Sequence, residues 1–404
     1  MDLRFSAAEE EYRSRVRGFL EPALAGPYAE VRGRGGPGDE EGAFAARQRW
    51  ERHLAAEGWT CLGWSREHGG RGASLVEEVI FHEEYTRADG PGRLGHIGET
   101  LLGPTLIALG TPEQQARFLP PIRACDELWC QGYSEPNAGS DLANVQCRAE
   151  RVGGEWSITG QKVWTSGAAH SDWCFALCRT DPDAPRHQGI SYLLVPMRQA
   201  GVEIRPIQQI TGTSEFAEVF FDGARTDAGN VVGPVHGGWK VAMATLGFER
   251  GASTLGQQLA FAGELDAVIT AARENGALRE PVMRQRLAQA WMGLRIMRLN
   301  ALRILSDAAG GGGAVGGGST SVDRAAYITK IYWANWHREL GKIAVDVLGA
   351  LSEVHDAGGG EPYPLTRLQR LFLWTRCDTI YAGSNQIQRD IIGERALGLP
   401  REGR

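Results

Sequence analysis

The hydrophobic period of this sequence changes twice, near residue 130 and near residue 240, and this constrains the fold more than any other feature. Residues 1–129 read as helical and begin with a capping box at Ser6–Glu9. Behind that box, apolar residues recur at helical spacing: Tyr12, Val16, Phe19 and Leu20. A second helix start is predicted at Thr111, which is followed by Pro112 and by Gln114 at the third position.

The central segment, 130–240, has the pattern of a β-domain. Short runs rich in Val, Ile, Trp and Phe alternate there with glycines, and Gly153-Gly154 is typical of a hairpin turn. The runs expected to be strands are ITGQKVWTS, DWCFALCRT, ISYLLVPM, VEIRPIQQ and FAEVFFDG. They predict a small antiparallel sheet or barrel of about 100 residues.

Helical periodicity returns after Gly237-Gly238-Trp239 and continues to the end of the chain, so 241–404 is expected to be a helical bundle. Gly310–Gly318 is too rich in glycine for the interior of a helix and is expected to be a loop. The last helix is predicted to start at Ser384 and to stop at Gly398. The expected class is α+β, with domains at 1–129, 130–240 and 241–404.

Composition excludes several classes of protein. Hydrophobic residues are 42% and charged residues 23% of the 404, which is typical of a folded globular chain. The net charge of −6, without a long basic stretch, argues against a nucleic-acid partner. There is no apolar run of membrane-spanning length and no apolar signal-peptide core, so we expect a cytoplasmic protein without a membrane partner.

The seven cysteines are expected to be free and mostly buried, because their number is odd and no export signal precedes them. Cys174 and Cys178 are four residues apart in a predicted strand, which places both on one face. No second Cys or His pair accompanies them, so no metal site is predicted.

Five segments, in order, resemble the signature motifs of the acyl-CoA dehydrogenase family. They are QGYSEPNAGSD at 131–141, GQKVWTSGA at 160–168, EFAEVFFD at 215–222, GFERG at 247–251 and YAGSNQIQRDIIGERALGLP at 381–400. The resemblance covers essentially the whole chain, including the helical, β and helical order. It implies that FAD binds between the β-domain and the C-terminal helices.

The same resemblance assigns cofactor contacts to the β-domain. Tyr133 and Ser134 fall in the first motif, with the Ser134 hydroxyl at the flavin pyrimidine edge. Ser166 would meet flavin N5, and Trp164 would lie over the ring, which suits a flat cofactor with a polar rim. A lone Trp on a strand would otherwise be read as a core aromatic.

Three further residues are implied to contact ligand phosphate groups or the cofactor. Ser140 matches a position near the phosphates of FAD and coenzyme A, although a simple Ser or Asx turn is the alternative. Ser384 and Gln386 match cofactor contacts near the start of the last helix. Ser384 also suits a plain helix cap, and both roles are compatible.

The catalytic base requires a comparison of two positions. Many family members carry Glu where this sequence has Ala382, which cannot accept a proton. The isovaleryl- and long-chain-type members carry it instead at the position of Glu249. The resemblance therefore implies that Glu249 removes the α-proton while the β-hydrogen passes to flavin N5 as hydride. The alternative for Glu249 is a surface residue or an ion pair with Arg.

The thioester carbonyl must also be polarised. In the family, a ribityl hydroxyl of FAD and one backbone N–H do this, and that N–H would belong to Ala382. Arg250 matches an Arg behind the substrate pocket, where its role is either substrate binding or structural.

Two departures affect the part of the FAD site that a neighbouring subunit completes. The family's Arg-x-x-Phe-Gly segment is missing, and either Arg284 or Arg286 is a possible substitute. Asp346 and Ala350 stand where many members have Gln and Gly. These departures leave a hetero-oligomer open, whereas the family pattern implies a homotetramer or homodimer.

Three functions follow from the resemblance. The first is FAD-dependent α,β-dehydrogenation of an acyl-CoA or acyl-carrier thioester, with an electron-transferring flavoprotein as acceptor. The second is a flavin oxidase or monooxygenase on the same fold. The third is a non-catalytic partner subunit of a hetero-oligomeric dehydrogenase.

Overall fold

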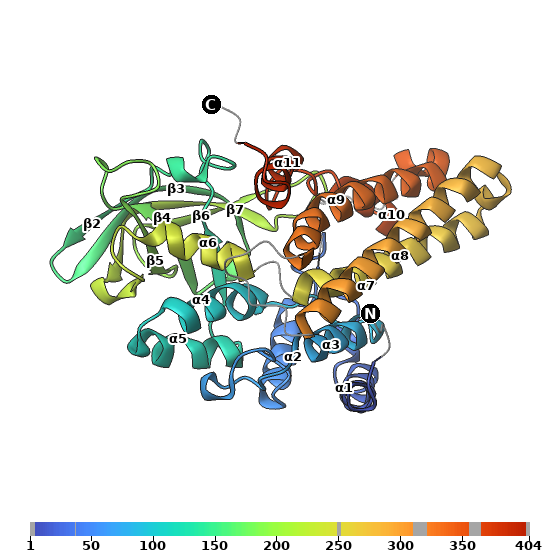
Figure 1. Cartoon of the computed structure of the whole chain (residues 1–404), viewed down its shortest axis with the longest axis horizontal. Coiled ribbons are helices and arrows are strands. Elements are labelled where there is room, and N and C mark those ends of the chain that lie inside the picture. The colour runs from blue at the N-terminus through green and yellow to red at the C-terminus, as the bar shows by residue number, and fades with distance from the viewer. Residues whose placement is uncertain (1–4, 37, 249–251, 310–320, 355–364, 401–404) are drawn as a thin grey trace.

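A computed structural model describes residues 5–36, 38–248, 252–309, 321–354 and 365–400. Five helices form the first part of the chain: α1 Ala7–Ala25, α2 Phe44–Ala56, α3 Leu75–Arg87, α4 Gly103–Leu109 and α5 Pro112–Ala124. The capping boxes expected at Ser6 and Thr111 are both present. In Figure 1 these helices lie below the β-sheet and below the C-terminal bundle.

Eight strands make up a single sheet: β1 Trp129–Gly132, β2 Arg148–Val152, β3 Glu155–Ser166, β4 Trp173–Arg179, β5 Ile190–Pro196, β6 Val202–Ile207, β7 Phe216–Asp227 and β8 Val231–Val232. The strand order is β6-β7-β3-β2-β4-β5-β8, with β1 paired to β4. The five predicted strand runs correspond to β3, β4, β5, β6 and β7, and Gly153-Gly154 joins β2 to β3 as expected.

The prediction of an antiparallel sheet is wrong at two pairings. Strands β1 and β2 both pair with β4 in parallel. Neither is joined to β4 by a hairpin: β1 leads out of helix α5, and β2 continues into β3. Parallel pairing is possible because the longer connections bring the chain back to the end of the sheet at which β1 and β2 begin.

The C-terminal part consists of α6 Gly238–Phe248, α7 Ala252–Glu274, α8 Pro281–Ala309, α9 Ser321–Leu348, α10 Arg367–Trp374 and α11 Asn385–Ile391, which continues as a π-helical turn over Ile392–Ala396. Helices α7, α8 and α9 share one apolar core. They form the arm that projects to the right in Figure 1. The loop expected at 310–318 lies outside the described residues.

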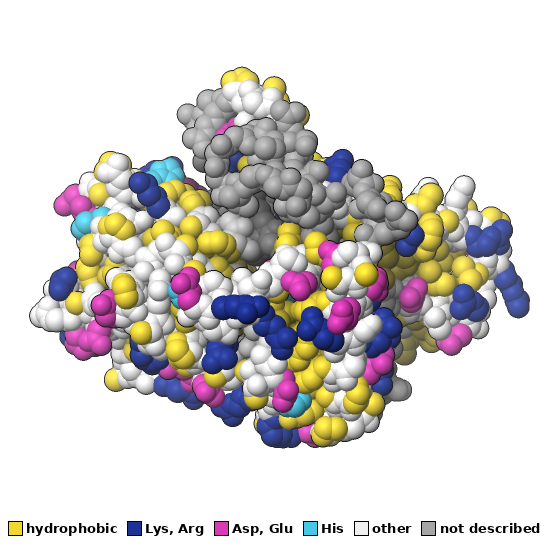
Figure 2. Space-filling model, turned by 60° about the horizontal axis from the view of Figure 1, so that its bottom comes forward, with side chains coloured by type: hydrophobic (Ala, Val, Ile, Leu, Met, Phe, Trp, Pro, Cys, Tyr) yellow, Lys and Arg dark blue, Asp and Glu magenta, His cyan; other side chains and the backbone are white. Residues whose placement is uncertain are grey.

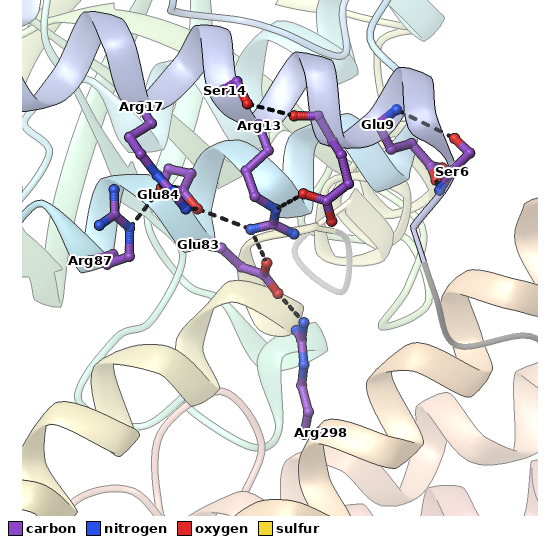
Figure 3. A network of polar contacts seen from close by, with 10 residues as sticks. Ser6, Glu9, Arg13, Ser14, Arg17, Glu83, Glu84, Arg87 and Arg298 are labelled. Carbon is purple, nitrogen blue, oxygen red and sulfur yellow. Dashed lines mark hydrogen bonds and ion pairs between the residues drawn. The ribbon is translucent and has the colours of Figure 1, made fainter.

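A network of ion pairs around two buried glutamates joins the N-terminal helices to this bundle (Figure 3). On α3, one carboxylate oxygen of Glu83 lies 2.7 Å from Arg13 of α1, and the other pairs with Arg298 of α8. The neighbouring Glu84 contacts Arg13, Arg17 and Arg87. Burial would raise the pKa of Glu84, but its hydrogen bonds to these arginines lower it to about 2. The three helices are therefore held in a fixed arrangement.

The seven cysteines are free thiols and six of them are buried, as expected. Cys174 and Cys178 belong to the same core cluster on one face of the sheet. None of the helices within the described ranges is long and apolar enough to cross a membrane. Nor does the described part of the chain contain a group of His, Cys, Asp and Glu side chains that could hold a metal ion.

Candidate active site

A β-bulge in β3 turns Trp164 out of the sheet. The register of β3 against β7 shifts between Lys162 and Thr165, and the Trp164 backbone is left-handed, with φ of 59°. The indole is 58% exposed and meets the ring of Phe216 edge-on, with 6.0 Å between the ring centroids. A bulge re-aims a side chain in this way, so Trp164 is not a core aromatic.

The loop that follows β1 is fastened beside this bulge. The backbone N–H of Val163 donates to the Ser134 carbonyl at 2.9 Å. The ammonium of Lys162 donates to the Tyr133 carbonyl at 3.3 Å. The Tyr133 ring is buried against Phe175 and Tyr192, whereas Ser134 is half-buried. Ser134 therefore lies at the edge of the bulge, and the Tyr133 ring is part of the core.

The other two serines of the β-domain differ in their surroundings. Ser166 is the last residue of β3, is half-buried and pairs with Phe216 in register. Ser140 is exposed in the loop between β1 and β2. The next residue, Asp141, forms an ion pair with Arg186. Ser166 thus lies next to the Trp164 bulge, whereas Ser140 lies on the β1–β2 loop.

The C-terminal motif forms a left-handed turn in front of α11. Ala382 has φ of 49° and Gly383 has φ of 86°. Ser384 is the helix cap, because its hydroxyl accepts a hydrogen bond from the Ile387 N–H at 3.4 Å. Gln386 is exposed. Gln388 donates to the Ala382 carbonyl at 3.2 Å, but no acceptor among the described residues meets the Ala382 N–H.

Glu215 and Phe216, at the start of β7, connect the bulge to the C-terminal motif. The Glu215 carbonyl accepts a hydrogen bond from the Gly167 N–H at 3.0 Å. The Phe216 ring stacks on Trp374 of α10, with 6.4 Å between the centroids and 10° between the ring planes. These contacts bring the segment around Ser166 next to the chain that leads to Ala382.

The Glu215 side chain adds an unusual carboxyl group to this junction. Burial and, to a smaller extent, the neighbouring Glu40 carboxyl together raise its pKa to about 8. One oxygen of each carboxyl group is buried, and a side-chain hydrogen bond between the two groups is among the causes of the raised pKa. The negative charge of Glu215 also contributes to the raised pKa of Cys377 and of Tyr381, where burial is the main cause. The EFAEVFFD motif alone does not indicate that Glu215 is half-buried, with one carboxyl oxygen enclosed beside Glu40.

Two predicted site residues, Glu249 and Arg250, lie outside the described residues. Helix α6 ends at Phe248 and helix α7 begins at Ala252. Their assignment as base and as substrate contact therefore remains a prediction.

The positions expected to face a neighbouring subunit are occupied by an internal ion pair. Arg286 of α8 lies 2.7 Å from Asp346 of α9 and 3.4 Å from Glu339. Arg284 instead donates to the carbonyl of Leu278 at 3.0 Å. Ala350 is exposed in the 3₁₀ turn Gly349–Glu353. Arg286 and Asp346 therefore satisfy each other within one chain.

Comparison with protein families matches the whole architecture. The acyl-CoA dehydrogenase N-terminal domain matches residues 6–126, the middle domain 130–224 and the C-terminal domain 236–397. The chain is 56% identical over 393 residues to the acyl-CoA dehydrogenase IpdE1 of Mycobacterium tuberculosis, covering 97% of this chain and 98% of that protein. It is 36% identical to FadE34 of the same organism, covering 95% of this chain and 49% of FadE34.

Solved structures agree with the sequence comparisons. The Tcur3481-Tcur3483 steroid ACAD superposes with a TM-score of 0.83 at 32% identity, over the full length of both chains. The ChsE4-ChsE5 complex from Mycobacterium tuberculosis superposes with a TM-score of 0.80 at 27% identity, over 99% of this chain and 100% of that one.

Proposed function

This chain belongs to the acyl-CoA dehydrogenase family of flavoprotein oxidoreductases, and from this premise we propose that it oxidises an acyl thioester between Cα and Cβ with Glu249 as the base. Members of this family typically bind FAD. The reaction needs three things from the protein: a platform for the cofactor, a donor for the thioester carbonyl and a base for the α-proton.

The residues beside the β3 bulge fit a flat aromatic cofactor with a polar rim. Trp164 presents an exposed indole, and the half-buried residues Ser134 and Ser166 lie next to the same bulge. When bound, the flavin supplies the oxidant that takes up the β-hydrogen as hydride. The chain's part is to hold this ring: Trp164 by its face, and the serines by hydrogen bonds to its rim.

The observation that carries the proposal is the turn at Ala382. Its backbone is left-handed and exposed, and its N–H meets no acceptor among the residues that the structure describes. A backbone donor of this kind can stabilise the negative charge that develops on a thioester oxygen as the α-proton leaves. The donor does not depend on the side chain, so the absence of Glu at this position leaves it in place.

The base must come from elsewhere, and Glu215 is not suited to this role. Glu215 has a pKa of about 8, so it holds its proton at neutral pH and cannot accept another. Glu249, in the sequence just before α7, matches the position of the base in the isovaleryl- and long-chain-type members of the family. We therefore assign proton removal to Glu249.

The acyl carrier and the partner proteins follow from the relatives. We propose coenzyme A as the carrier and a ring-bearing acyl group, because a full-length structural match is described as a steroid ACAD. An electron-transferring flavoprotein is the proposed acceptor.

The assembly state is proposed from one surface of the bundle. Helix α8 exposes the apolar side chains of Trp291, Met292, Ile296 and Leu299. Next to them, a groove of about 570 Å³ runs between α8 and α9. Figure 2 shows apolar side chains along this projecting arm, among Lys and Arg. We propose that this face is a subunit interface, either with a second copy or with a second type of chain.

An anaerobic titration of the FAD-loaded protein with a panel of acyl-CoA thioesters tests the function. We expect the visible flavin band to bleach with one class of thioester in the wild type, and the bleaching to be lost in Glu249→Gln. Glu274→Gln, an exposed position at the far end of α7, is the matched control and should bleach normally. Bleaching that persists in Glu249→Gln would move the base to another residue. No bleaching with any thioester would overturn the dehydrogenase assignment.

A further inference from the structure

A buried histidine connects two helices of the bundle to the segment that carries Ala382. His337, on α9, is 4% exposed. Its Nε2 lies 2.7 Å from a carboxylate oxygen of Glu264 on α7. Its Nδ1 lies 2.8 Å from a carboxylate oxygen of Asp378, in the chain between α10 and α11. Burial alone would lower the pKa of His337, but the hydrogen bonds to the two carboxylates raise it to about 9.

Asp378 also contacts Tyr381, the residue that directly precedes Ala382. The second carboxylate oxygen of Asp378 accepts a hydrogen bond from the Tyr381 hydroxyl at 3.1 Å. The Asp378 carbonyl accepts one from the Lys330 ammonium, which also lies 4.8 Å from the centre of the Tyr381 ring. His337, Asp378 and Tyr381 therefore form one continuous chain of contacts.

Helix α9 holds the other end of the same turn. The Asn385 side chain donates to Asn335 at 3.0 Å, and the Asn385 N–H donates to the Thr379 carbonyl at 3.1 Å. A non-glycine residue such as Ala382 is strained in the left-handed region, because its Cβ atom crowds the backbone there. Such a conformation persists only where the surrounding structure holds it in place. Here α9 holds residues 378–385 through the hydrogen bonds of His337 to Asp378 and of Asn335 to Asn385.

We propose that His337 is a positioning residue: it holds the Tyr381–Gly383 turn so that the Ala382 N–H points at the thioester carbonyl. This inference rests on the proposed function. An imidazolium suits the task because its two N–H groups leave the ring in diverging directions, so one side chain can bridge carboxylates on α7 and on the turn. A hydrogen bond between charged partners is also stronger and more directional than a neutral one. Through His337 and Glu264, the segment that carries the Ala382 N–H is connected to α7. In the sequence, α7 begins just after Glu249.

The test is the rate of anaerobic flavin reduction by the thioester that reduces the wild type. In His337→Gln we expect a fall of about 10- to 100-fold at saturating thioester, since a displacement of about 1 Å from the productive geometry costs as much. FAD content should stay at the wild-type level. The kinetic isotope effect with α-deuterated thioester should increase, because weaker carbonyl polarisation makes α-proton removal slower.

Two variants separate positioning from general damage to the bundle. Glu264→Gln keeps a hydrogen-bonding partner for His337 and should retain most of the rate. Asn275→Ala removes a hydrogen bond between the end of α7 and the Val347 carbonyl of α9, at 2.7 Å and far from the turn, and should leave the isotope effect unchanged. If His337→Gln does not fold, Tyr381→Phe, which removes only the bond to Asp378, provides the same measurement.

A wild-type rate and isotope effect in His337→Gln, or in Tyr381→Phe where that variant is used, would overturn the inference. An equal loss in Asn275→Ala would also overturn it, since the effect would then reflect the bundle as a whole. A wild-type protein that no thioester reduces is a different outcome, because it removes the proposed function itself.

Discussion

The ammonium group of Lys162 lies 2.7 Å from a carboxylate oxygen of Glu135, and both side chains are buried. The same ammonium donates to the carbonyl of Leu177 at 2.6 Å and to that of Tyr133 at 3.3 Å. The Glu135 carboxylate accepts the backbone N–H groups of Gln146 and Cys147. This buried pair therefore ties the loop carrying Ser134 to the middle of the sheet.

Removing one charge of this pair should destabilise the protein strongly. We expect Lys162→Met to lower the free energy of unfolding by about 3–5 kcal/mol, because it leaves the Glu135 carboxylate buried and uncompensated. The double variant Lys162→Met/Glu135→Gln should recover part of this loss. Urea denaturation measures both, with Arg205→Met as control, since the Arg205–Glu203 pair is exposed to solvent and should contribute little to stability. A loss in Lys162→Met no larger than in the control would contradict the prediction.

Trp164→Ala should weaken FAD binding and leave the fold intact. The indole is largely exposed, so little core packing is lost. An aromatic stacking contact contributes about 0.5–1.5 kcal/mol, which corresponds to a dissociation constant for FAD about 2- to 13-fold higher. Titration of the apoprotein with FAD, followed by flavin fluorescence, gives this constant. Val152→Ala, which shortens an exposed apolar side chain on β2, should not change it.

The catalytic carboxylate should be movable from position 249 to position 382. In the Glu249→Gln background, Ala382→Glu should restore part of the bleaching by thioester, because it places a carboxylate where many members of the family carry their base. The turn should tolerate the change, since Ala already adopts the left-handed backbone there and the position is exposed. Ala382→Gln in the same background cannot accept a proton and should restore nothing. Equal recovery in both variants would argue against a role for the carboxylate.

Glu215 should make the protein less stable as pH rises. Its folded pKa of about 8 lies above the ordinary value of 4.5, so the unfolded chain loses this proton first. The contribution of Glu215 is therefore complete below pH 4.5 and is lost as pH rises towards 8. Urea unfolding at several pH values should show a smaller decline over this range in Glu215→Gln than in the wild type. Curves of equal slope would show that the folded carboxyl group ionises normally.

His337 should contribute a second decline at higher pH. Its folded pKa of about 9 exceeds the ordinary 6.5, so its bonds to Glu264 and Asp378 stabilise the fold fully below pH 6.5. This contribution is lost as pH rises from 6.5 to 9. In His337→Gln the decline over this window should be weaker. NMR titration of the imidazole in the wild type checks the same point directly, and a midpoint at or below 6.5 would contradict it.

Local features of the fold could be predicted from the sequence because they depend on neighbouring residues. The capping boxes at Ser6 and Thr111 and the glycine turn at Gly153 each involve residues only a few positions apart. The family motifs also placed Ala382 and Ser384 at the start of the last helix, where the structure has them.

The remaining features depend on partners that are distant in the sequence. The bulge at Trp164 exists because β3 and β7 lose register, and the periodicity of either strand alone does not show this. The parallel pairing of β1 and β2 with β4 follows from the connections between them. The position of the Glu215 carboxyl group beside Glu40 and the contacts of His337 depend on residues that are distant in the sequence, so no local pattern indicates them.

The pairing of β3 with β7 also determines when the site can form during synthesis. Trp164 leaves the ribosome long before Phe216, the residue that opens β7 and supports the indole. Contacts between segments so far apart form late, because the chain between them must first be ordered. A nascent chain that stops before β7 therefore contains Ser134, Trp164 and Ser166 but has no surface on which to hold a flat ring. The Trp164–Phe216 contact can therefore form only after strands β1 to β7 have all been synthesised.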